Sequence, residues 1–238
     1  MKTIVYKNES RGFANHGWLK SHHTFSFAGY QNPERMNFGM LRVFNDDVVQ
    51  PKMGFGTHPH QNMEIISIPL KGALSHKDSM GNKRAIEVGE VQVMSAGTGL
   101  THSEFNDSKT DEVNFIQLWI IPEEMNVEPN YEQRKFDKEE RHNKLQTIVV
   151  PKDKLEDNAL PISQKAYIYR SHLDSDKQIS VDLKSSDNGL FVFVIDGEIG
   201  IAENKLSSRD AMGIYDTSQV SIQAHQDSEL IIIEVPMS

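Results

Sequence analysis

Two short segments of the sequence carry side chains that could bind one metal ion together. The first contains His58 and His60, and the second contains His102 and Glu104. Because side chains alternate faces along a β-strand, residues two positions apart point the same way, roughly 6 to 7 Å from each other. Two such strands side by side would direct four ligands to one point. Imidazole nitrogens and carboxylate oxygens are ligands that divalent transition metals accept.

The stretch between the two segments predicts how they meet. A single His-x-His pattern is common by chance, so the pairing of two ligand pairs is the stronger signal. Strand-like runs cover residues 65–70 and 91–94, and turn residues occupy 79–82 and 88–90. We expect an antiparallel meander that brings the second pair of ligands back beside the first.

Glu64 is the competing candidate for the acidic ligand. It has the same parity as His58 and His60, but four extended residues carry it roughly 13 Å beyond His60. Since a buried carboxylate needs partners, we expect Glu64 to accept hydrogen bonds around the ligands rather than to bind the metal. His76 lies beyond Gly72 and is expected in a turn or at the surface.

One further segment and one further polar residue are candidates for the site. Residues 22–27 alternate aromatic and hydroxyl side chains at a period of two, which predicts a half-buried strand rather than another source of ligands. Gln117 is the one polar residue deep in the apolar run 113–121. If buried, its amide needs a partner, which a ligand carboxylate or a substrate could provide; a satisfied core amide is the other interpretation.

Composition limits the class of protein. A chain of 238 residues can form one large or two modest domains, and the absence of cysteine excludes disulfides and thiolate ligands. A net charge of -9 disfavours binding to nucleic acid phosphates and to anionic lipid. No apolar run approaches the ~20 residues that a membrane span needs, and the N-terminus has no apolar leader. We therefore expect a soluble, cytoplasmic protein that does not bind nucleic acid or membranes directly.

These motifs resemble a known family. The spacings of the two ligand segments, His58-x-His60-x3-Glu64 and Gly89-x12-His102-x3-Asn106, resemble the two motifs of the cupin superfamily. More narrowly, the chain resembles the pirin family through His58-Pro59-His60, residues 94–99, His102-Ser103-Glu104 and Gln117-Leu118-Trp119. The resemblance extends through the C-terminal half to bacterial members assigned as quercetin 2,3-dioxygenases.

The resemblance implies an all-β bicupin, in which two antiparallel β-barrels of the jelly-roll type pack together. It implies one metal, held by His58, His60, His102 and Glu104 in the N-terminal barrel. The ion is expected to be iron, with nickel, copper, manganese, cobalt and zinc as alternatives, because affinity order alone does not select among them.

The division into two barrels is expected in the charge-dense segment 135–144. We predict a metal-binding barrel at residues 1–141 and a second barrel at residues 142–238. Residues 190–199 echo residues 65–73, which indicates a diverged copy.

The second copy has no His or Glu pair where the four candidate ligands stand in the first. His172 and His225 are isolated in the sequence and are expected at the surface. The C-terminal barrel should therefore lack a metal.

The resemblance also implies a reaction. A flavonol and dioxygen would be the substrates, Glu104 would remove the proton of the flavonol 3-hydroxyl, and the heterocycle would open with loss of carbon monoxide. A monomer is expected. One alternative is a non-enzymatic pirin-like protein that acts as a redox-sensitive regulator through protein partners, although the chain shows no basic cluster. Another is a dioxygenase for a different enolic or catecholic compound.

Overall fold

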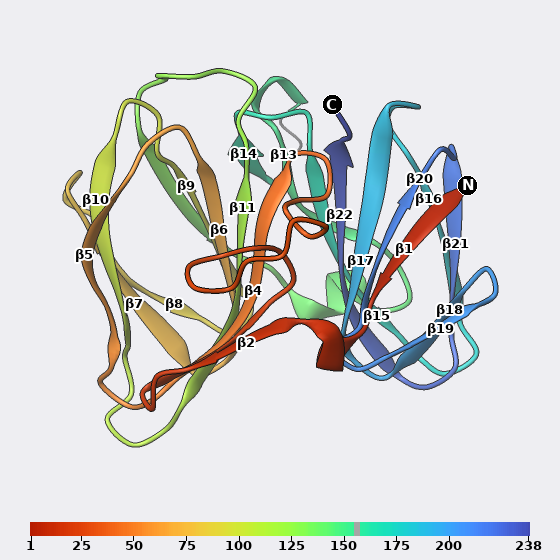
Figure 1. Ribbon diagram of the computed structural model, residues 1–238, viewed down its shortest axis with the longest axis horizontal. Helices are drawn as coiled ribbons and strands as arrows, with labels where there is room; N and C mark the ends of the chain where they lie inside the picture. The colour runs from red at the N-terminus through yellow and green to blue at the C-terminus, as the bar shows by residue number, and fades with distance from the viewer. Residues whose placement is uncertain (155–157) are drawn as a thin grey trace.

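Two β-barrels lie side by side in the computed structural model, which describes residues 1–154 and 158–238 (Figure 1). Each barrel consists of a seven-stranded and a four-stranded antiparallel sheet, apart from one parallel strand pair. The predicted all-β bicupin is confirmed. The helical segments of the described residues are short 3-10 turns: η1 (Asn8–Ser10), η2 (Lys138–Arg141) and η3 (Lys152–Lys154). No helix among these residues is long and apolar enough to cross a membrane.

The N-terminal barrel contains the two segments with the candidate ligands. Its larger sheet has the order β12 (Asn130–Lys135), β9 (Glu90–Ser95), β6 (Glu64–Lys71), β11 (Val113–Ile120), β4 (Leu41–Val49), β3 (Leu19–His23) and β2 (Gly12–Asn15). Its smaller sheet has the order β5 (Gly54–His60), β10 (Leu100–Asn106), β7 (Ala73–Asp78) and β8 (Lys83–Glu87).

The C-terminal barrel repeats this topology, in agreement with the predicted internal copy. Its smaller sheet has the order β16 (Gln178–Asp182), β21 (Gln219–Ala224), β18 (Glu198–Ile201) and β19 (Asn204–Ser207). Its larger sheet has the order β1 (Lys2–Tyr6), β20 (Ala211–Tyr215), β17 (Asn188–Asp196), β22 (Ser228–Pro236), β15 (Tyr167–Leu173), β13 (Gln146–Pro151) and β14 (Leu160–Ile162). Strand β17 lies between β20 and β22 as β6 lies between β9 and β11.

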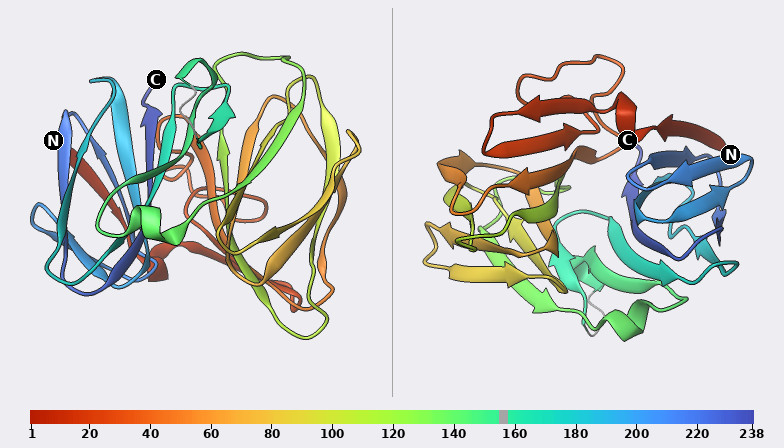
Figure 2. Two further views of the ribbon diagram at one scale, coloured as in Figure 1. Left: turned by 180° about the vertical axis from the view of Figure 1, so that it is seen from behind. Right: turned by 90° about the horizontal axis from the view of Figure 1, so that it is seen from below.

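The first strand of the chain belongs to the sheet of the second barrel. Strand β1 pairs antiparallel with β20, from Lys2 opposite Tyr215 to Tyr6 opposite Ala211. Figure 2 shows the chain running from there into the N-terminal barrel before it returns to build the C-terminal one. The two barrels are thus connected in two ways, by the linker between them and by β1, which precedes the N-terminal barrel in sequence but belongs to the C-terminal sheet. A boundary at residue 141 stays a prediction.

The largest apolar cluster lies between the two seven-stranded sheets. Phe44, Ile66 and Leu118 contribute to it from the N-terminal barrel, and Phe193 and Ile231 from the C-terminal one. The rings of Phe44 and Phe193 are 4.7 Å apart. Neither large sheet could expose this face to water without a large loss of stability.

The interiors of the two barrels differ. One continuous apolar cluster, which includes Ile179 and Ile222, fills the C-terminal barrel. The N-terminal barrel has two smaller clusters instead, one with Phe115 and the other with Trp119 at its edge. Gln117 lies between these two residues on β11, so the space between the small clusters is polar.

The dependence of the N-terminal barrel on its partner can be tested with a fragment of residues 1–141. The fragment loses the sheet with which β1 pairs and exposes one side of the largest apolar cluster. A domain's net stability is only about 5 to 15 kcal/mol, which is too small to offset that exposure. We expect an aggregated or molten fragment with no cooperative transition in calorimetry and no near-ultraviolet circular dichroism. A soluble fragment that unfolds cooperatively would contradict this.

Candidate metal centre

The two ligand segments lie on neighbouring strands. Strands β5 and β10 pair antiparallel, and His102 lies directly opposite His58. The prediction that the two segments lie side by side is confirmed, but the prediction that an antiparallel meander joins them is wrong. Strands β6 and β9, which lie between the segments in sequence, cross to the other sheet.

Three imidazoles converge at this point. His58, His60 and His102 each offer a ring nitrogen, and these three atoms lie within 4.8 Å of one another. The ring centroids are separated by 4.5 Å for His58 and His102 and by 4.9 Å for His60 and His102. Such spacing suits a single ion that binds all three nitrogens.

The hydrogen bonding of the individual rings leaves nitrogen atoms free to bind a metal. His102 is buried, and neither of its ring nitrogens has a hydrogen-bond partner among the described residues. Since an unpartnered buried nitrogen is costly, a bound ion would satisfy a group that the protein leaves open. In His58, Nδ1 lies 2.8 Å from the carbonyl oxygen of Gly56. A proton on Nδ1 that is donated to this carbonyl leaves Nε2 free to coordinate.

Burial keeps two of the rings neutral. Burial first, and then the neighbouring imidazoles, together lower the pKa of His60 to about 4 and that of His102 to about 3. Both rings therefore present a free lone pair at neutral pH, as a metal ligand must.

Glu104 lies on the same strand as His102 and is buried. Its Oε2 accepts a hydrogen bond of 2.8 Å from the side-chain amide of Gln117, and its Oε1 accepts one of 3.3 Å from the Ser67 hydroxyl. Of the partners considered for Gln117, the structure shows a carboxylate, that of Glu104. Ligand atoms of Glu104 and His102 also lie within 4.8 Å of a third group, on His76.

The expectation that His76 lies in a turn or at the surface is wrong. It is fully buried on β7, directly opposite Glu104 on β10. Its Nε2 lies 3.1 Å from a carboxylate oxygen of Asp78, and its ring is 5.3 Å from that of His102. Leu74, His76 and Asp78 alternate inward along the strand, and this period of two was the signal that could have found His76.

The expected place of Glu64 beside the ligands is also wrong. Its carboxylate accepts hydrogen bonds from the Ser95 hydroxyl, at 2.6 Å, and from the backbone of Ser163. It lies on the face of β6 that carries Ile66 into the apolar cluster between the barrels. Asn62 has a positive φ of 51° between β5 and β6, so the alternation of faces does not continue from one strand to the next.

A cavity of about 600 Å³ is lined by Gln117, the residue that donates a hydrogen bond to Glu104. It opens at the seam of the N-terminal barrel, where edge strands β2 and β5 leave the two sheets unpaired. Polar side chains from three neighbouring strands face it, namely Ser21, His23, Asn45, Asp47 and Gln117. Aromatic side chains from the edge strands and loops close it, namely Phe13, Trp18, Phe27, Tyr30 and Phe55.

One wall of this cavity comes from the segment predicted as a strand at residues 22–27. Strand β3 ends at His23, so only its first part is confirmed, and the chain then forms a loop up to β4. Phe27 of this loop packs edge to face on Trp119, which packs in the same way on His60. The aromatic wall of the cavity therefore continues to the imidazole cluster.

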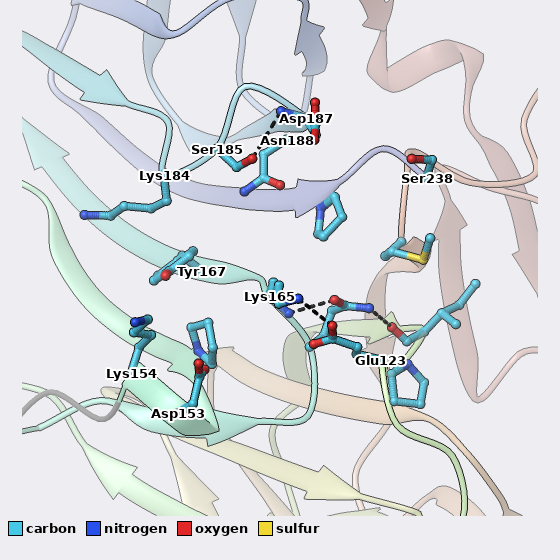
Figure 3. Close-up of a pocket in the computed structure, with 16 residues that line it drawn as sticks. Glu123, Asp153, Lys154, Lys165, Tyr167, Lys184, Ser185, Asp187, Asn188 and Ser238 are labelled. Atoms are coloured by element: carbon cyan, nitrogen blue, oxygen red, sulfur yellow. Dashed lines mark hydrogen bonds and ion pairs between the residues drawn. The ribbon is translucent and has the colours of Figure 1, made fainter.

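A second groove, of about 660 Å³, lies between the barrels (Figure 3). Its lining includes Tyr167, Lys184 and an ion pair of 2.6 Å between Lys165 and Glu123. None of its lining residues is a histidine. This groove therefore contains none of the candidate ligands. His60 lines a separate pocket of about 580 Å³, whereas the cavity beside Gln117 is connected to the candidate ligands through the Gln117–Glu104 hydrogen bond.

The equivalent positions of the C-terminal barrel are apolar. Strand β16 directs Ile179 and Val181 inward, and β21 directs Val220 and Ile222 inward, where they pack in the apolar cluster. These side chains offer no atom that binds a metal. Outside that interior, His225 is exposed as expected.

His172 is partly exposed, in keeping with its expected place near the surface, and it has neighbours on other segments. Its ring lies 5.8 Å from that of His142 and its Nε2 lies 3.9 Å from a carboxylate oxygen of Asp174.

Comparisons with known proteins agree with this geometry. The family model described as Pirin matches residues 6–120, and that described as Quercetinase C-terminal cupin domain matches residues 148–235. Quercetin 2,3-dioxygenase from Escherichia coli K12 is 44% identical over 230 residues, which are 97% of each chain. A pirin-like protein from Caulobacter vibrioides is 38% identical over 94% of this chain and 95% of its own. The crystal structure of the bacterial pirin YhhW from Escherichia coli in complex with nickel(II) superposes with a TM-score of 0.93 at 41% identity, covering 100% of both chains.

The lowered pKa values predict how acid affects the metal-free protein. Unfolded imidazoles protonate near pH 6.5, whereas the folded His102 resists protonation until about pH 3. The unfolded state therefore binds more protons in this interval, and the free energy of unfolding should fall with pH by at most about 1.4 kcal/mol per unit for this ring. The partly exposed His60 contributes less.

Urea unfolding at pH 7, 6 and 5 measures this slope. His102→Gln should reduce this slope, relative to the wild type, by the contribution of about one proton, which is at most about 1.4 kcal/mol per pH unit. An unchanged slope would show that His102 already titrates normally in the folded protein.

Proposed function

The chain belongs to the pirin family, and on that premise we propose that it is a metal-dependent quercetin 2,3-dioxygenase. It would open the heterocyclic ring of a flavonol with dioxygen and release carbon monoxide. The family and the bicupin fold predicted from the sequence are confirmed, and so is the relation to enzymes named quercetin 2,3-dioxygenase. The observation that carries the proposal is the imidazole cluster beside a cavity with polar and aromatic walls.

His58, His60, His102 and Glu104 are the proposed metal ligands. The imidazoles offer converging nitrogens, and Glu104, two residues after His102 on β10, has a carboxylate oxygen within 4.8 Å of a His102 ring nitrogen. Nickel is bound by the Escherichia coli relative, whereas we expect iron here; the donor set accepts either. When bound, the ion would supply a Lewis acid for a substrate oxygen and a path for electrons to dioxygen.

Glu104 is also the proposed base for the flavonol 3-hydroxyl. A carboxylate has about four lone-pair positions, so Glu104 can accept from Gln117 and Ser67 and still receive a proton. The two donors fix its orientation, which is what a general base requires. The proton would leave the 3-hydroxyl as the flavonolate forms.

The cavity supplies the binding energy and excludes water. A volume of about 600 Å³ lies in the range of small-molecule sites. Aromatic side chains such as Trp18 and Phe55 would stack on the planar rings of a flavonol, while the polar side chains hydrogen-bond its hydroxyl groups. A planar, polyhydroxylated substrate fits both kinds of wall.

Metal loading and turnover test the function directly. After loading with iron, nickel, copper, manganese or cobalt, the protein should contain about one ion per chain by elemental analysis. At least one form should consume one dioxygen and release one carbon monoxide per quercetin. His102→Ala should lose most of the metal and the activity, and the exposed His225→Ala should lose neither.

The outcomes separate the two hypotheses about function. A protein that binds metal but turns over no flavonol in any metal form would favour the non-enzymatic regulator. About two ions per chain would show that a second site exists outside the imidazole cluster.

Replacing each acidic candidate by its amide distinguishes their roles. Glu104→Gln should retain some metal, because an amide oxygen coordinates weakly, while turnover falls by roughly 10²-fold or more through loss of the base. Glu64→Gln should affect thermal stability rather than turnover, because Glu64 lies at the barrel interface. If Glu64→Gln strips the metal and Glu104→Gln leaves activity intact, the ligand assignment is wrong.

A further inference from the structure

A row of polar side chains on the cavity wall takes no part in metal binding or in proton transfer by Glu104. Ser21 and His23 on β3, and Asn45 and Asp47 on β4, line the cavity and are all buried in the protein. A wall that only had to hold an apolar ring would not need four buried polar groups, since each of them must be hydrogen-bonded.

The row is an ordered extension of the site around Glu104. Across the sheet, Gln117 lies opposite Asn45 and Asn45 lies opposite His23. Asn45 Oδ1 lies 2.9 Å from His23 Nδ1, which lies 3.2 Å from the Ser21 hydroxyl. Asp47 is one two-residue step further along β4 than Asn45, about 6 to 7 Å away.

Asp47 is the unusual member of the row. Its neighbour Asp46 faces the other barrel and pairs with Arg209 at 3.0 Å and Arg11 at 3.6 Å. No ion pair among the described residues includes Asp47, and the hydroxyl of Ser21 donates to one of its carboxylate oxygens. Burial, together with the negative charges of Asp46 and Glu104, raises the pKa of Asp47 to about 7, against the effect of the Ser21 hydrogen bond.

A buried carboxyl group without a cation, on the wall of a cavity, is suited to a neutral hydroxylated ligand. A phenolic hydroxyl donates well to a carboxylate, and such a bond does not require a positive charge on the ligand. In a flavonol, the B ring is attached to the carbon next to the one that carries the reacting 3-hydroxyl. Its hydroxyl groups therefore lie several ångströms from the reacting oxygen, as Asp47 lies beyond the residues that adjoin Glu104.

We propose that Asp47, held by Ser21, is the specificity determinant of the cavity and accepts a hydrogen bond from a B-ring hydroxyl of the flavonol. This inference rests on the proposed function. It assigns the orientation of the substrate: the 3-hydroxyl lies toward Glu104 and the B ring lies along β4 toward Asp47. A flavonol without B-ring hydroxyl groups leaves the carboxyl group with no hydrogen bond from the ligand and should bind poorly.

Binding in the absence of turnover tests the assignment. The chain has two tryptophans; Trp18 lines the cavity and Trp119 packs on Phe27 of its wall, so tryptophan fluorescence should report occupancy. Metal-free protein is titrated with quercetin and with galangin, which is quercetin without its B-ring hydroxyl groups. The wild type should bind quercetin roughly ten- to a hundredfold more tightly than galangin, because galangin cannot donate this hydrogen bond to the buried carboxyl group.

Asp47→Asn should remove most of this preference by weakening the binding of quercetin, with galangin changed less than about twofold. Ser21→Ala should act in the same direction, and it decides the question if Asp47→Asn does not fold. Asp46→Asn is the matched control, because it makes the same change on the opposite face of β4; it should lower the melting temperature and keep the wild-type preference.

The possible failures are distinguishable. If the loaded wild type turns over no flavonol, the proposed function fails and the role of Asp47 fails with it. If the wild type turns over quercetin but binds galangin equally well, or if Asp47→Asn and Ser21→Ala keep the wild-type preference, only the role of Asp47 is overturned.

Discussion

The apolar contact between the two seven-stranded sheets determines which side chains of these sheets point into the interior of each barrel. Because side chains alternate along a strand, β4 buries Phe44 between the barrels and turns Asn45 inward, and β11 buries Leu118 and turns Gln117 inward. A shift of either strand by one residue would place its polar side chain in the largest apolar cluster. The contact therefore sets the register that aligns Gln117 with Glu104. The ion pair of Asp46 with Arg209 reinforces this register across the barrels.

This arrangement lets the N-terminal barrel have a polar interior. The C-terminal barrel fills the same topology with Ile179, Val181, Val220 and Ile222, and so gains stability from its own core. The N-terminal barrel places imidazoles and a carboxylate at these positions, and its apolar interior is reduced to two small clusters. Its outer face compensates by packing on the neighbouring barrel. The C-terminal barrel thus has a physical role that requires no ligand of its own.

Local patterns predicted the parts of the site that depend on local geometry. The spacing of two residues within each ligand pair is a property of one strand, and the prediction that the two pairs lie side by side is correct. The failures occur where the chain turns. Gly72, with a φ of 75°, ends β6 but directly precedes another strand, so His76 lies in the interior instead of a loop. The pairing of β1 with the C-terminal sheet, and the placement of β6 and β9 in the larger sheet, depend on contacts between residues far apart in the sequence. No local periodicity encodes such contacts.

The electrostatics of the interior explain why imidazole rather than lysine or arginine surrounds Glu104. A buried carboxylate is costly without compensation, and Glu104 receives hydrogen bonds from neutral groups on Gln117 and Ser67. Burial also lowers the pKa values of His60 and His102, so these rings bring no positive charge at neutral pH. A fixed cation would form an ion pair with Glu104 and occupy the space between the rings. Neutral rings instead leave the compensating charge to be supplied by a divalent ion, whose field would also extend to Asp47. Because Asp47 interacts with Glu104 through space, the charge at the metal centre would then influence how strongly the far end of the cavity accepts a hydrogen bond. Binding of the ion and recognition of the substrate would thus be coupled through two carboxyl groups that never touch.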